Sequence, residues 1–136
     1  PEFGEHDPGP QCDGLKYTEF TERFGDPDWE NDPYGVTFPG GETIAEFQIR
    51  IGVATRALIE RVGSGTAIVF CHGGVVDTVL RQSLRTSGTG IFEIHTKNTS
   101  ITEFVIVRPG RSRLVRYNDA AHTADLPAST NRPEDF

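Results

Sequence analysis

The sequence predicts a single α/β domain in which helices flank a mixed, mainly parallel sheet. Three patterns along the 136-residue chain indicate this class. A long amphipathic helix is expected over 44–62, a continuous apolar run follows at 66–71, and a second helical pattern begins after Gly74. An apolar run between two helices is typical of a strand that is covered on both faces, as in a parallel sheet.

The ends of the predicted helices are marked in the sequence. Thr43 followed three residues later by Glu46 forms a capping box, in which each side chain satisfies a backbone N–H of the first turn. Apolar residues then recur at three- and four-residue steps until Gly63 ends the pattern. A shorter helix is predicted over 15–24 and also ends at a glycine.

The remaining segments are predicted to be loops, a hairpin and a tail. Residues 5–14 and 25–41 are rich in Gly, Pro and Asp, a composition that favours irregular loops. The β-rich runs 100–107 and 113–117 are joined by a short Pro-Gly segment, which predicts a closing hairpin. The polar, Pro-rich stretch 118–136 is expected to be a tail.

Charge and composition exclude several classes of function. The formal net charge is -7 and the 13 Lys and Arg are dispersed, which argues against nucleic-acid and membrane-surface binding because both need clustered cations. The longest uncharged apolar run is far shorter than the roughly 20 residues that span a bilayer. Cys12 and Cys71 form no paired motif, so we expect a reduced, cytoplasmic protein. Residues 1–3 are typical of an expression-vector remnant, and Glu5 is the first acid to which we give weight.

The segment Cys71-His72-Gly73-Gly74 carries the clearest functional pattern. It places a histidine, two glycines and a helix N-terminus directly after the predicted strand, where open α/β sheets bind ligands. Glycine lets the backbone approach an anion closely, and the free N–H groups of the helix favour negative charge. A protonated His72 adds a charge-assisted donor, although a histidine that only packs at a strand end has the same pattern.

Three further motifs occur in a fixed order around this segment, at 5–9 (Glu-His-Asp-Pro-Gly), 40–43 (Gly-Gly-Glu-Thr) and 98–101 (Asn-Thr-Ser-Ile). With these motifs and His72-Gly73, the chain resembles the histidine phosphatase superfamily, whose fold is phosphoglycerate-mutase-like, over about residues 5–117. The resemblance implies that Glu5 is a catalytic general acid. It also implies that His72 is catalytic and that His72 and Gly73 bind phosphate.

The reaction that the resemblance implies is a phosphoryl transfer through a phosphohistidine. A histidine attacks phosphorus while Glu5 protonates the departing alkoxide, and water then hydrolyses the phosphohistidine. His72 would hold the equatorial oxygens of the phosphoryl group. The substrate is expected to be a phosphorylated small molecule, and neither a cofactor nor a metal ion is expected to take part.

The chain departs from the family in one respect. The family nucleophile lies in an Arg-His-Gly triplet at the end of a central first strand, and no such triplet occurs here. The resemblance therefore implies an N-terminally truncated, partial domain over 1–136 that is inactive by itself, while the intact parent is a phosphatase or mutase. An exposed strand edge would then favour homo-oligomers. The alternative is a non-catalytic phosphate-binding or interaction module.

Other chemistries fit the sequence less well. A cysteine phosphatase requires an arginine six positions after its cysteine, and the residue six positions after Cys71 is Asp77. We expect Cys71 to be a buried strand residue and not a nucleophile. An α/β-hydrolase would need a Gly-x-Ser-x-Gly elbow, which the sequence lacks. The cysteines and histidines also lack the paired spacing of a zinc site.

Overall fold

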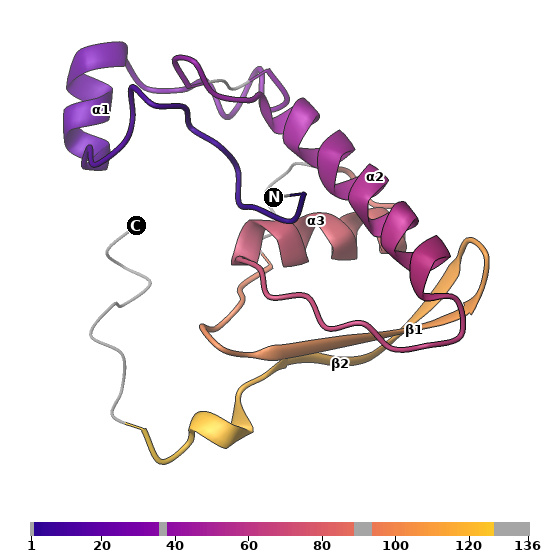
Figure 1. Ribbon diagram of the computed structural model, residues 1–136. Helices are drawn as coiled ribbons and strands as arrows, with labels where there is room; N and C mark the ends of the chain where they lie inside the picture. Colours follow the sequence, from indigo (N-terminus) through magenta and orange to yellow (C-terminus); the bar gives the residue numbers. More distant parts are fainter. Residues whose placement is uncertain (1, 36–37, 89–93, 127–136) are drawn as a thin grey trace.

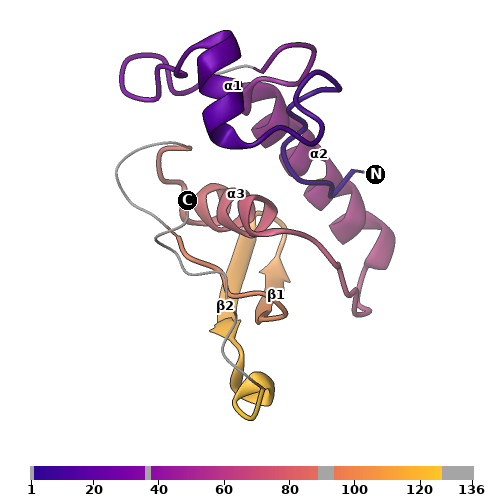
Figure 2. The same cartoon turned by 90° about the vertical axis from the view of Figure 1, so that its left-hand side faces the viewer.

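The computed structural model describes residues 2–35, 38–88 and 94–126. Within them the elements in chain order are α1 (Tyr17–Phe24), α2 (Ile44–Val62), α3 (Gly73–Leu84), β1 (Ile101–Arg108), β2 (Arg111–Asp119) and a short 3-10 helix (Ala121–Thr123). Figures 1 and 2 show α3 between α2 and the β1–β2 hairpin, and in Figure 1 α1 stands apart from α2, joined to it by a loop. The mixed α/β character that the sequence predicted is confirmed.

Helix α2 begins and ends as its sequence predicts. The hydroxyl of Thr43 accepts a 3.1 Å hydrogen bond from the Glu46 N–H, and the Glu46 carboxylate accepts one of 2.8 Å from the Thr43 N–H. The bond from the Thr43 N–H, and then one of 2.9 Å from the Thr43 hydroxyl to the same carboxylate, lower the pKa of the Glu46 carboxyl. Gly63, with a φ of 59°, ends the helix. None of the helices in the described part of the chain combines the length and apolar character needed to cross a bilayer.

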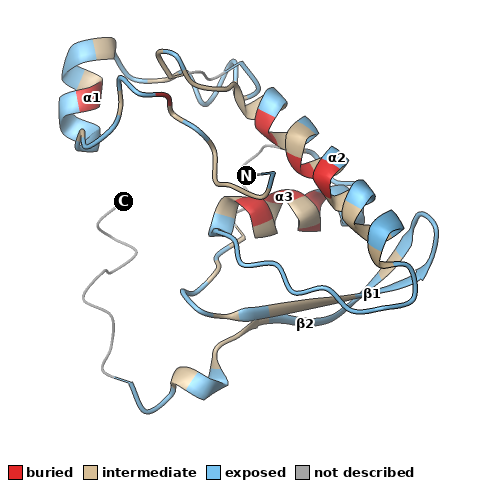
Figure 3. Cartoon of the chain, viewed as in Figure 1, coloured by how far each residue is buried: buried red, intermediate tan, exposed pale blue. Residues whose placement is uncertain are grey.

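A small core joins α2 to α3. Phe47 and Ile51 of α2 pack with Val75 of α3, and Phe3 and Val79 lie against this cluster. Figure 3 shows buried positions on both helices. Ile51 is fully buried, and burying such a side chain contributes about 1.5–3 kcal/mol. The core therefore fixes α3 against α2 and brings the N-terminal segment to the same place.

The predicted hairpin is confirmed. Strands β1 and β2 pair antiparallel, with Phe104 opposite Leu114. Pro109 and Gly110 form the connection, and Gly110 has the positive φ, 74°, that Pro-Gly turns require at their second residue. Val105 and Leu114 are each 43% exposed, so these apolar side chains of the hairpin are only partly covered by the described residues.

The predicted parallel sheet is not found in the described residues, whose sheet is the antiparallel hairpin alone. The predicted strand 66–71 is wrong here: this segment is an irregular stretch between α2 and α3 (Figure 1). Ile68 is 79% and Phe70 93% exposed, and Cys71 is exposed rather than buried. A strand needs neighbours that satisfy its backbone groups, and the described backbone hydrogen bonds supply none to this run.

Candidate functional site

The carboxylate of Glu5 lies at the N-terminal end of α3. Its Oε2 accepts a hydrogen bond of 2.9 Å from the N–H of Gly74, and its Oε1 accepts one of 2.9 Å from the N–H of His6. The first N–H groups of a helix lack partners within the helix and lie at the positive end of its dipole, so they stabilise a carboxylate. The structure thus brings Glu5 next to the segment that contains His72 and Gly73.

Glycine at position 74 is what allows this approach. A Cβ atom built on Gly74 would lie 2.3 Å from Oε1 of Glu5, well inside van der Waals contact. Any side chain at this position would push the Glu5 carboxylate away from the helix end. The second glycine of the His-Gly-Gly sequence is therefore required by the position of Glu5.

His72 and Gly73 face solvent at the same helix end. His72 is the N-cap of α3, with φ of -101° and ψ of 174°, and its side chain makes no capping hydrogen bond within the described structure. Both residues are exposed. A Cβ on Gly73 would lie 3.8 Å from the Cβ of Thr96, so the segment before the hairpin passes beside the site. The imidazole of His72 is therefore accessible to a ligand at the start of α3.

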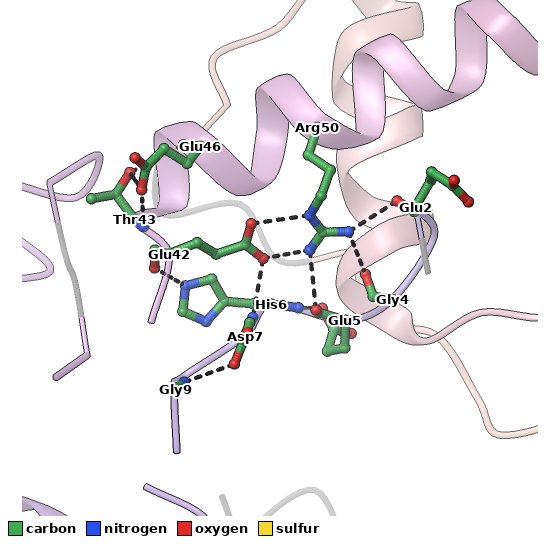
Figure 4. Close-up of polar contacts among 10 residues, drawn as sticks. All are labelled: Glu2, Gly4, Glu5, His6, Asp7, Gly9, Glu42, Thr43, Glu46 and Arg50. Carbon is green, nitrogen blue, oxygen red and sulfur yellow. Dashed lines mark hydrogen bonds and ion pairs between the residues drawn. The ribbon is translucent and has the colours of Figure 1, made fainter. Parts of the chain in front are cut away.

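Arg50 of α2 binds the chain segment that carries Glu5 (Figure 4). Its Nη1 donates to the carbonyl oxygens of Glu2 and Gly4, at 2.9 and 3.1 Å, and its Nη2 donates to that of Glu5 at 3.2 Å. Its Nε and Nη2 also bind the two carboxylate oxygens of Glu42, the first at 3.0 Å. The hydrogen bonds between the two side chains raise the pKa of Arg50 and lower the pKa of Glu42.

Glu42 holds the next residues of the same segment. Its Oε1 accepts a hydrogen bond of 3.1 Å from the N–H of Asp7, and its own N–H donates to the Asp7 carbonyl at 3.0 Å. The Glu42 carbonyl accepts a bond of 2.7 Å from Nε2 of His6. The His6 ring packs against Phe38 and Phe47, with centroids 5.4 and 5.8 Å apart. The loop after Glu5 is therefore attached to the start of α2.

The sequence pointed to part of this arrangement only. Glu5, His72 and Gly73 were predicted as site residues, and the structure places them together. Glu42 belongs to a sequence motif to which no role was given, and no sequence pattern singled out Arg50. Arg50 binds backbone carbonyls that lie 45 to 48 positions earlier in the chain. Patterns among neighbouring residues cannot predict contacts over that separation.

Cys71 lies in an environment that disfavours a thiolate. Although Cys71 as a whole is exposed, neighbouring atoms desolvate its thiol, and this desolvation, and then the negative charge of Glu5, raise the pKa of the thiol. A nucleophilic cysteine needs the opposite shift. Asp77, which stands where a cysteine phosphatase carries an arginine, accepts a 2.7 Å hydrogen bond from Nε of Arg81. This geometry supports the prediction that Cys71 is not a nucleophile.

Two hollows in the surface lie away from the candidate site. One, of about 220 Å³, is lined by residues of α2 and α3 such as Gln48 and Arg81. The other, of about 320 Å³, lies beside α1 and is lined by residues such as Phe20 and Asp28. Neither is lined by Glu5 or His72.

Comparison with known families places this site in context. The family model described as the histidine phosphatase superfamily (branch 1) matches residues 1–120 of the 136-residue chain. The comparison with curated proteins gave no match. The matched range contains Glu5, the Arg50–Glu42 pair and the His72-Gly73 segment. With the greater part of its sequence inside that range, the chain belongs to the histidine phosphatase superfamily.

Proposed function

We propose that the chain is part of a phosphatase or phosphoglycerate-mutase-like enzyme in which Glu5 is the general acid and His72 and Gly73 bind the phosphoryl group. The observation that carries the proposal is the hydrogen bond from the Gly74 N–H to the Glu5 carboxylate. It sets the carboxylate of Glu5 beside a helix end that favours anions, and this end also carries an exposed histidine. Membership of the superfamily supports the reaction class.

The positions of these groups suit general acid catalysis on a phosphate ester. Free N–H groups at the start of α3 and a protonated His72 would stabilise the negative oxygens of a phosphoryl group. Glu5 would donate the proton that the departing alkoxide requires.

The nucleophile is proposed to come from outside these residues. An Arg-His-Gly triplet, which the sequence lacks, would supply a phosphohistidine in the intact parent, so the isolated chain is proposed to be inactive. In that parent, we propose that residues 66–71 form a strand of a mainly parallel sheet. The exposure of Ile68 and Phe70 supports this, because a neighbouring strand and its helices would cover both side chains.

The test is an assay of the intact parent, defined as the protein that carries these residues together with an Arg-His-Gly segment. An alkyl phosphomonoester such as glycerol phosphate is the substrate, and a chelator is present throughout. Glu5→Gln and His72→Ala should each lower kcat by at least ~10²-fold, the loss expected when a preorganised donor is removed. Full activity of either variant, or loss of wild-type activity on chelation, would contradict the proposal.

A second candidate function is an interaction module without catalysis. The observation that favours it is the exposure of large apolar side chains at Ile68 and Phe70, which is unusual for a surface without a partner. If no parent with an Arg-His-Gly segment exists, the chain would bind phosphate or a protein without turnover. The gene sequence upstream of the codon for Gly4 distinguishes the two candidates.

A further inference from the structure

We infer that Arg50 and Glu42 are positioning residues that hold Glu5 at the N-terminal end of α3. The inference rests on the proposed function, because that proposal gives the Glu5 carboxylate its role. In the described residues, the hydrogen bonds of Arg50 and Glu42 do not reach the Glu5 carboxylate, His72 or Gly73. Both act on the backbone that carries Glu5, which Figure 4 shows beside the two side chains.

The first observation is how Arg50 distributes its donors. Three of its hydrogen bonds go to the N-terminal segment, at the carbonyls of Glu2, Gly4 and Glu5, and the others go to Glu42. The side chains of Arg50 and Glu42 are 29% and 17% exposed, so this pair is better shielded than a surface ion pair. Arg50 makes five hydrogen bonds to described residues, which matches the five N–H donors of a planar guanidinium, whereas an ammonium has only three.

The second observation is that the backbone around Asp7 and Gly9 lies in close contact with the backbone of residues 40–41. A Cβ on Gly41 would lie 2.3 Å from the carbonyl oxygen of Asp7, and one on Gly9 would lie 2.4 Å from the N atom of Gly41. These atoms belong to backbone and cannot rotate away. The segment 5–9 therefore lies directly against the residues that precede α2, where Glu42 also binds the backbone of Asp7.

The third observation is that α2, which holds the backbone of Glu5, packs against α3, whose Gly74 N–H binds the Glu5 carboxylate. Arg50 precedes Ile51 in α2, and Gly74 precedes Val75 in α3, and Ile51 and Val75 belong to one buried cluster. The group that holds the Glu5 backbone and the N–H that binds the Glu5 carboxylate are thus fixed to each other through the core. Placement at this level matters because a misplacement of about 1 Å can cost ~10²-fold in rate.

The deciding experiment measures the Gly74 amide by NMR in the 136-residue chain. Replacing Glu5 by Gln removes the carboxylate that accepts from this N–H, so the Gly74 signal should move. In an Arg50→Ala background the same replacement should move it by less than half as much. Arg56→Ala, on an exposed position of the same helix, is the control and should leave the full response.

Two further variants keep the result interpretable. Glu42→Gln preserves the shape of the side chain, removes its charge, and should reduce the response in the same direction as Arg50→Ala. Arg50→Lys should not restore it, because the three donors of an ammonium cannot replace the five hydrogen bonds of Arg50. A full Gly74 response in Arg50→Ala and Glu42→Gln, or a full response in Arg50→Lys, would overturn the inference.

Kinetics of the parent separate this inference from the proposed function. If Arg50 positions a proton donor, Arg50→Ala should lower kcat for an alkyl phosphomonoester and spare p-nitrophenyl phosphate, whose leaving group needs little protonation. A loss that is equal for both substrates would assign Arg50 a purely structural role. Arg50→Ala could reduce the Gly74 response in NMR as expected while Glu5→Gln leaves kcat unchanged for both substrates. In that case Arg50 positions Glu5, and Glu5 is not the general acid.

Discussion

The N–H of Gly74 donates a hydrogen bond of 2.9 Å to Oε2 of Glu5, joining two residues that are 69 positions apart in the sequence. The contact connects the irregular N-terminal segment to the helix that follows His72. It depends on the absence of a side chain at position 74 and on the anchoring of the Glu5 backbone by α2. Each of these dependences can be tested separately.

A methyl group at position 74 should displace Glu5 without harming the fold. In Gly74→Ala the new Cβ would lie 2.3 Å from Oε1 of Glu5, and the carboxylate is the flexible end of its side chain and can move away. Alanine in a helix is more stable than glycine by roughly 0.5–1 kcal/mol. The melting temperature should therefore stay the same or rise, while parent activity on an alkyl phosphomonoester falls as in Glu5→Gln. A clear fall in melting temperature would show that the contact matters mainly for stability.

The close contact of the segment 5–9 with residues 40–41 should make the chain more sensitive to alanine at Gly9 than at Gly14. Gly9 and Gly14 have nearly the same φ, 79° and 75°, so alanine is strained equally at both. Only at Gly9 would the Cβ also meet backbone atoms, since the space around Gly14 is open. Urea unfolding should show Gly9→Ala to be less stable than Gly14→Ala by about 1–3 kcal/mol, the usual cost of overpacking. Equal losses of stability in Gly9→Ala and Gly14→Ala would mean that the segment 5–9 is not tightly packed against residues 40–41.

The ion pair between Glu42 and Arg50 should make stability depend on acidity. The hydrogen bond from Arg50 lowers the pKa of Glu42, so the unfolded chain binds more protons than the folded one in this range. The contribution is fully present above the ordinary glutamate pKa of about 4.3 and is lost as the pH falls through the lower folded value. Urea unfolding at a series of pH values should show this decline, and Glu42→Gln should make the profile flatter. The difference between the two profiles isolates Glu42 from other carboxyls with lowered pKa values, such as Asp119.

The uncovered segment 66–71 should promote association between copies of the chain. Phe70 is 93% exposed and Ile68 79%, and unpaired backbone beside apolar side chains favours pairing with another chain. Sedimentation of the wild-type chain should show concentration-dependent association that Phe70→Lys weakens. Ile49, which is 66% exposed on α2, provides the control, and Ile49→Lys should leave association unchanged. A monomer at all concentrations, or equal effects of both variants, would rule out this surface.

Local chemistry explains what the sequence could predict. The capping box at Thr43, the glycine at the end of α2 and the Pro-Gly connection of the hairpin each act within a few residues, so their patterns are sufficient. The strand over 66–71 failed because an apolar run reports that a segment can be buried, while strand formation depends on partners elsewhere in the chain. Arg50 was missed for the same reason, since three of its hydrogen bonds go to backbone carbonyls of the N-terminal segment, which no side-chain pattern reveals.

The dependence of rate on the leaving group tests the central claim most directly, because it reports whether Glu5 donates the proton. In the intact parent, kcat/KM is measured for phosphomonoesters whose leaving groups span a wide range of basicity, with wild type and Glu5→Gln compared. A general acid makes the rate nearly independent of leaving-group basicity, so the variant should show a much steeper decline toward basic alkoxides and near-normal rates for p-nitrophenyl phosphate. The same slope in both proteins would show that Glu5, despite its place beside Gly74, is not the proton donor.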